Sequence, residues 1–260
     1  MSAVITITRQ RAQLAARAFV TPRRREQSTV ALGLPGAKPF SVFMGTSIIS
    51  GIEKGVGPAL LLVHGWERQV SDFSSLIPVL LGAGYRVIAF DLPAHGASES
   101  VTASIPTCAE ACMAMQQKFG EFHAVIGHSV GALIAAQATI LGLKLNRAVA
   151  ISAPARYEEC ARRFARQSEL RDDEADEMIR ALDGMGANAS TISLPNIAHN
   201  LAGHALFIHS RDDRVVPFSD SLENAKAWSG AMFLQLDNLG DRRILNCPDV
   251  LRTIADFVRT

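Results

Sequence analysis

Short apolar runs that alternate with helical segments are the feature that most constrains how this chain folds. The run PALLLVHG (58–65) is continuously apolar and stopped by glycine, which is typical of a strand buried on both faces of a parallel sheet. Comparable runs follow at 85–91, 122–129 and 145–153. Helical patterns such as 106–119 and 130–143 separate them, which predicts βαβ units with right-handed crossovers. We therefore expect an α/β fold with a mostly parallel central sheet flanked by helices.

The alternation is interrupted between about residues 154 and 200. This charged stretch has a helical period and contains no strand candidate. We interpret it as a small helical lid over one edge of the sheet, although a long crossover connection would give the same pattern. The alternation then resumes with a strand at 204–210, and residues 31–260 are expected to form a single domain.

Residues 1–30 form a basic N-terminal arm. Arginines occur in it without any acidic residue before Glu26, at positions 9, 11, 17, 23, 24 and 25. Such a start is found in organelle transit peptides, but also in basic helices that lie on a domain surface. We favour the surface helix.

Composition excludes several classes of function. The formal net charge is +1, so no overall field favours nucleic acid, and no apolar run has the roughly 20 residues needed to span a bilayer. The four cysteines have no CxxC spacing, which argues against a metal site and suits a reducing, cytoplasmic compartment. Neither a GxGxxG nor a P-loop sequence is present, so we expect no cofactor.

The sequence GHSVG (127–131) carries the strongest chemical signal. It follows a predicted buried strand and opens an apolar helix, which is the context that a nucleophilic serine at a strand–helix turn requires. Such a turn is strained, and the glycines on either side leave room for it. Ser129 is therefore the candidate nucleophile. The N–H of Val130 and a loop N–H from VHGW (63–66), assigned to Trp66, would form an oxyanion hole.

A late pair of carboxylates supplies the candidate acid. Asp212 and Asp213 follow the strand at 204–210 and precede a valine–proline turn. Together with GHSVG, VHGW and FDLPAHGAS (90–98), this segment resembles the α/β-hydrolase superfamily, in particular its lipase- and esterase-like members. The resemblance implies the chain order nucleophile, acid, histidine, and its D-x-x-V-P spacing selects Asp213.

The chain departs from this family at the last position. The segment GDRRIL (240–245) resembles the family's G-H-R-R-I-L, so Asp241 stands where the general base belongs, and no histidine occurs after His209. An aspartate is a poor base for a serine hydroxyl at neutral pH. We expect Asp241 to lie close to Ser129 Oγ, separated from it by a small gap or one water.

Two functions of different class follow from these residues. The first is a serine hydrolase of carboxylic esters or related acyl compounds, acting through an acyl-enzyme on Ser129 and impaired at Asp241. The second is a non-catalytic binding protein that keeps the pocket. A third interpretation is an otherwise active enzyme in which position 241 alone has changed. The expected partner is a small acyl or ester molecule, and the oligomeric state is left open.

Overall fold

A single eight-stranded sheet organises the computed structural model, which describes residues 2–24, 35–144, 146–201 and 203–259. Its strand order is β1-β2-β4-β3-β5-β6-β7-β8. Strand β2 pairs antiparallel with β1 and with β4, and all other neighbouring strands pair parallel. The strands are β1 (Lys38–Met44), β2 (Ser47–Lys54), β3 (Ala59–Val63), β4 (Arg86–Phe90), β5 (Ala124–His128), β6 (Arg147–Ile151), β7 (His204–Ser210) and β8 (Met232–Leu236). The expected mostly parallel α/β sheet is therefore confirmed.

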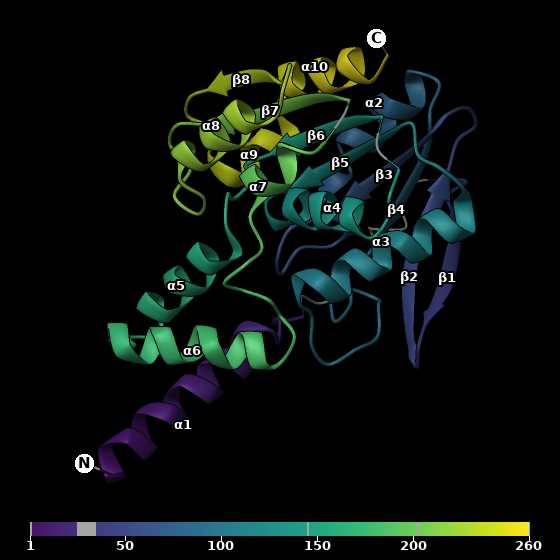
Figure 1. Ribbon diagram of the computed structural model, residues 1–260. Helices are drawn as coiled ribbons and strands as arrows, with labels where there is room; N and C mark the ends of the chain where they lie inside the picture. Colours follow the sequence, from purple (N-terminus) through teal and green to yellow (C-terminus); the bar gives the residue numbers. More distant parts are fainter. Residues whose placement is uncertain (1, 25–34, 145, 202, 260) are drawn as a thin grey trace.

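Helices cover both faces of this sheet (Figure 1). The described helices are α1 (Ser2–Phe19), α2 (Leu76–Gly82), α3 (Ile105–Phe119), α4 (Val130–Ile140), α5 (Tyr157–Gln167), α6 (Asp172–Gly184), α7 (Leu194–Ala198), α8 (Phe218–Ala227), α9 (Gly240–Arg243) and α10 (Pro248–Arg259), with 3-10 turns at Val70–Phe73 and Ile244–Asn246. Alternate residues of β3 enter different cores. Leu61 and Val63 pack with α3 and α4, whereas Leu60 and Leu62 pack with α2 and α10. This two-sided burial explains the continuously apolar runs.

The position of β5 determines where a site can form. From β3 the chain passes to β4 on one side, and then returns to β5 on the other side of β3. Open parallel sheets bind ligands outside the carboxyl ends of their strands, at such a reversal of strand order. The loops that follow β3 and β5 meet at this point, and they carry VHGW (63–66) and Ser129.

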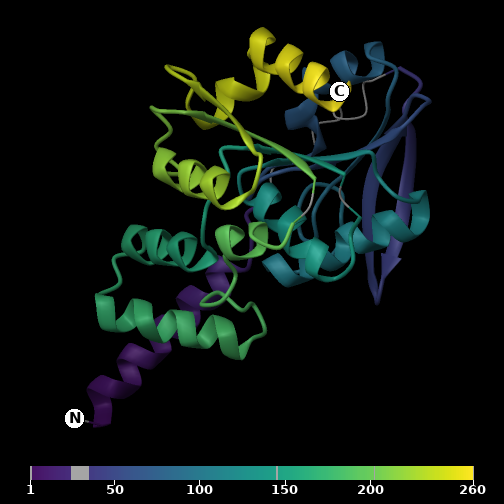
Figure 2. The ribbon, with the colours of Figure 1, turned by 45° about the horizontal axis from the view of Figure 1, so that its top comes forward.

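A group of helices extends from the sheet between β6 and β7. It contains α5, α6 and α7, and the N-terminal helix α1 lies beside α6 in both Figure 1 and Figure 2. The guanidinium of Arg11 on α1 donates to both carboxylate oxygens of the buried Glu174, at 2.8 and 3.1 Å. We call α1, α5 and α6 the cap. The end of the predicted basic arm, from residue 25 onward, lies outside the described residues.

None of the helices among the described residues is both long and apolar enough to cross a membrane.

Candidate active site

Ser129 occupies a strained turn between β5 and α4. Its backbone has φ 53° and ψ −128°, the positive φ expected from the flanking glycines. A Cβ on Gly127 would lie 2.5 Å from the backbone of Ala132, and one on Gly131 would lie 2.1 Å from the carbonyl oxygen of Val63. Real Cβ atoms do not approach backbone this closely, so only glycine fits at either position. This is the backbone geometry that a nucleophile elbow requires, and the role of Ser129 as the nucleophile stays a prediction.

The loop after β3 packs directly onto this elbow. A Cβ built on Gly65 would lie 3.1 Å from the Cβ of Ser129, so the backbone of the loop runs past the serine. The buried His64 fixes the loop, because its Nδ1–H donates to the carbonyl of Gly65 at 2.7 Å while its Nε2 accepts from the N–H of Leu92 at 2.9 Å. Burial lowers the pKa of His64 to about 4, which keeps this neutral tautomer.

Two backbone positions around Ser129 are suited to binding an oxyanion. Val130 is the first residue of α4, where N–H groups have no partner within the helix and the helix dipole favours negative charge. Trp66 lines the same pocket as Ser129, and its ring stacks on Phe19 with a centroid distance of 6.3 Å. Their roles as oxyanion donors stay a prediction.

Asp213 is the buried member of the aspartate pair. Its side chain is fully buried, whereas that of Asp212 is 41% exposed. The Oδ1 atom accepts from the backbone N–H groups of Val215 and Val216, at 2.8 and 2.9 Å. The Oδ2 atom lies 3.2 Å from Nε2 of His209 but has no hydrogen-bond partner among the described residues.

Burial alone raises the pKa of Asp213, but its neighbours reverse the effect. The nearby His209 and the N–H groups of Val216 and Val215 lower the pKa further than burial raises it, so the group is held as a carboxylate. His209 is a fully buried residue of β7, bonded through Nδ1 to Ser221 Oγ at 2.7 Å.

Asp241 lies in α9, in the loop after the last strand, but its carboxylate is already bound. Oδ2 accepts from Nη2 of Arg68 at 2.7 Å. The carbonyl oxygen of Asp241 accepts from Nε2 of His128 at 2.9 Å, which places this loop against the residue before Ser129. We expected the carboxylate to face Ser129 Oγ across a gap or a water. In the structure its partner is Arg68, a residue that the sequence reasoning missed.

None of the seven histidines, all of which lie within the described residues, lines the pocket that contains Ser129. His199 and His204 are both exposed, and His204 begins β7, at the end of the sheet away from Ser129. His128 is the nearest along the chain. Burial and Arg68 lower its pKa to about 4, and its Nδ1 is buried without a partner among the described residues.

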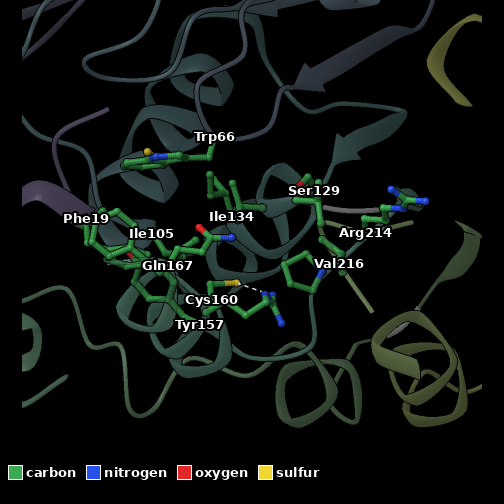
Figure 3. Close-up of a pocket in the computed structure, with 17 residues that line it drawn as sticks. Phe19, Trp66, Ile105, Ser129, Ile134, Tyr157, Cys160, Gln167, Arg214 and Val216 are labelled. Carbon is green, nitrogen blue, oxygen red and sulfur yellow. Dashed lines mark hydrogen bonds between the residues drawn. The ribbon is translucent and has the colours of Figure 1, made fainter. Parts of the chain in front are cut away.

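The pocket beside Ser129 has a volume of about 260 Å³ and lies between the sheet edge and the cap (Figure 3). One end is aromatic, because Phe19 of α1 lies 5.4 Å, centroid to centroid, from both Tyr157 and Phe164 of α5. The remaining lining residues are Trp66, Ser104, Ile105, Cys108, Ser129, Val130, Ile134, Pro154, Cys160, Arg163, Gln167, Arg214, Val215 and Val216. None of them is acidic.

Comparison with known proteins identifies the family and agrees with the fold. The sequence profile described as the alpha/beta hydrolase family matches residues 60–243. The chain belongs to this family. An esterase from Pyrococcus furiosus has the same fold, with a TM-score of 0.70 at 18% identity over 92% of this chain and 97% of the esterase.

Two curated relatives of this alpha/beta hydrolase match only part of it. The magnesium-chelatase 30 kDa subunit of Rhodobacter capsulatus is 41% identical over 101 residues, 37% of this chain and 35% of that protein. The pimeloyl-[acyl-carrier protein] methyl ester esterase of Photobacterium profundum is 30% identical over 105 residues, 40% of each chain. The chain thus spans about two fifths or less of the length of these relatives.

Proposed function

We propose that the chain is a serine hydrolase of carboxylic esters or related acyl compounds, which forms an acyl-enzyme on Ser129. The observation that carries the proposal is the strained turn at Ser129, which opens on a pocket and is packed against the loop of Gly65 and Trp66. In this arrangement the serine oxygen would attack the ester carbonyl, and the N–H groups of Trp66 and Val130 would stabilise the oxyanion. The family and its esterase members support this class of reaction.

Asp213 is suited to the role of the acid in the proton-transfer system. In a triad, the acid accepts a hydrogen bond from the imidazole and stabilises its charged form. Asp213 is buried, held as a carboxylate, and keeps Oδ2 without a hydrogen bond while Oδ1 is fully used. This is the acceptor that the missing histidine would use.

We propose that the general base is missing and that the activity is therefore impaired. A carboxylate that already accepts a short hydrogen bond from a guanidinium has little tendency to take a proton from a serine hydroxyl. It also cannot return that proton to a leaving alcohol as an imidazolium does. Oxyanion stabilisation and substrate binding alone would leave a rate roughly 10³–10⁴ above that in water.

A second function is favoured by the same ion pair. Because Arg68 neutralises Asp241 and no histidine lines the pocket, the site is also suited to a protein that binds an acyl compound without cleaving it. The two functions share the pocket and differ only in turnover.

The deciding experiment compares the unmodified chain with Ser129→Ala on short-chain nitrophenyl esters. Hydrolysis above the Ser129→Ala background supports the hydrolase, and equal rates in the two proteins support the binding protein. Mass spectrometry after exposure to a fluorophosphonate tests the nucleophile directly, since a covalent adduct is expected on Ser129 alone.

A further inference from the structure

The pocket beside Ser129 is apolar over most of its surface but contains two arginines. Arg163 lies on α5 and Arg214 on the loop after β7, and no acidic side chain lines the pocket with them. Two guanidinium groups without a carboxylate in the lining favour a ligand with negative charge.

Arg163 differs from the nearby Arg156 and Arg162 in how it is paired. Arg162 donates to Glu158 and Asp176 at 2.8–2.9 Å, and Arg156 forms an ion pair with Glu223. These two arginines have carboxylate partners at hydrogen-bond distance. Arg163 has none among the described residues.

The contacts of Arg163 are weak. Its Nη2 donates to Cys160 Sγ at 3.4 Å, the dashed line at Cys160 in Figure 3, and its Nη1 lies 4.0 Å from Asp220 Oδ2. Burial raises the pKa of the Cys160 thiol to about 11, so the sulfur is a neutral and poor acceptor. The carboxylate of Asp220 also accepts from the N–H of Ala155 at 3.2 Å.

A guanidinium has five N–H donors, and its side chain here is only 22% exposed. Most of these donors have no acceptor among the described residues, and a planar carboxylate matches their geometry. We propose that Arg163 is the recognition residue for a carboxylate on the ligand. The site then takes molecules with an apolar segment and a carboxylate at one end.

This inference deepens the proposed function and rests on it in one respect. If Ser129 acts on esters, the substrate class is a monoester of a dicarboxylic acid, with the ester at Ser129 and the free carboxylate at Arg163. Carboxylate binding itself needs no turnover. It can therefore be tested in a protein that cannot react.

The test measures binding of paired ligands to the Ser129→Ala protein by isothermal titration calorimetry. The ligands are the monomethyl esters of succinic, adipic and suberic acid, each compared with its neutral dimethyl ester. At one chain length or more, we expect the monoester to bind roughly tenfold or more tightly than the diester, since a charge-assisted hydrogen bond supplies the difference.

Three substitutions then test whether Arg163 causes the preference for the monoester. Arg163→Gln should abolish the preference, and Arg163→Lys should retain part of it. The matched control is Arg166→Gln, which removes the same charge from an exposed position of α5 outside the pocket and should leave the preference unchanged. Circular dichroism and thermal unfolding establish that each variant is folded.

Several results would overturn the proposal. They are equal affinity for monoester and diester at every length, binding of neither ligand, a preference that survives Arg163→Gln, or a preference that Arg166→Gln also removes. If Arg214→Gln removes the preference for the monoester and Arg163→Gln does not, the carboxylate binds at Arg214 and the proposal for Arg163 is wrong. Nitrophenyl ester turnover by the unmodified chain reports separately on the hydrolase, so the two proposals fail in different assays.

Discussion

The two halves of the candidate site are built by different means. The nucleophile half is set by backbone, since the turn at Ser129, the glycines beside it and the loop at Gly65 touch one another through main-chain atoms. The base half depends on single side chains, and there Asp241 is bound by Arg68. A backbone framework persists when one side chain changes, whereas proton transfer is lost with a single residue. A protein can therefore keep the fold and pocket of a hydrolase and yet lack the side chain that transfers the proton during hydrolysis.

The largest expected effect comes from restoring the base half. Asp241→His removes the partner of Arg68 and supplies an imidazole in the loop after β8, and we propose Asp213 Oδ2 as its acceptor. Removing a triad base can cost on the order of 10⁶ in kcat, so we expect ester hydrolysis to rise by on the order of 10³-fold. The rise should vanish in Asp241→His combined with Ser129→Ala. A folded Asp241→His protein with no rise on a broad ester panel would favour the binding protein.

The pH profile of that variant reports on Arg68. A cation beside an imidazole disfavours its charged form and lowers its pKa. Because only the neutral imidazole acts as a base, the acidic limb of the kcat/KM profile should lie at lower pH in Asp241→His than in Asp241→His combined with Arg68→Gln. Identical limbs would show that Arg68 does not approach position 241 in the restored site.

The next largest effect tests the backbone half. Gly131→Ala places a methyl group 2.1 Å from the carbonyl oxygen of Val63 and 2.6 Å from that of His64. Neither atom can move without displacing β3, so we expect the free energy of unfolding to fall by more than about 3 kcal/mol, measured by urea denaturation. Gly82→Ala, at the open end of α2, is the control and should be neutral or slightly stabilising. Equal stability of both variants would mean that the elbow is not tightly packed.

Sequence reasoning was most successful where main-chain geometry leaves a direct mark on residue type. Apolar runs stopped by glycine predicted the parallel strands, and GHSVG predicted the positive φ of Ser129. It missed the antiparallel strands β1 and β2 at the sheet edge. Their residues are mostly half exposed, so the run is broken by polar residues and the continuous apolar pattern is absent.

The partners of the site residues could not be predicted. Arg68 and Asp241 are 173 residues apart, and only the assembled fold brings them to 2.7 Å. The same holds for Phe19, which reaches the pocket because α1 packs against α6 and α5. Such contacts leave no local pattern in the sequence. A charged residue that forms a surface pair and one that completes a site look alike until their neighbours are known.

A smaller expected effect is the pH dependence of stability that arises from three buried histidines near Ser129. Burial lowers the pKa values of His64, His95 and His128 to about 4, below their ordinary 6.5. The unfolded chain therefore binds more protons between pH 6.5 and 4, and stability present above that window is lost as pH falls through it. Burial raises the pKa of Asp91, which opposes part of the loss. We expect unfolding by urea to cost about 2–3 kcal/mol less at pH 5 than at pH 6. A flat profile, or imidazole NMR signals that titrate near pH 6.5, would contradict neutral buried histidines.

The smallest expected effect tests whether Arg68 and Asp241 form a stabilising ion pair. Arg68 and Asp241 have side chains 12% and 24% exposed, so their pairing is only partly screened by water. A double-mutant cycle with Arg68→Gln, Asp241→Asn and the combined variant should give a coupling of about 1–2 kcal/mol in the free energy of unfolding. The cycle subtracts the contact of Arg68 with Asp72 at 3.9 Å, and the bond from His128 to the carbonyl of Asp241 is present in every variant. A coupling below about 0.3 kcal/mol would mean that Arg68 holds the Asp241 carboxylate no more firmly than water does. The carboxylate would then be available to accept a proton from Ser129, and the contrast between a complete nucleophile half and an occupied base half would not hold.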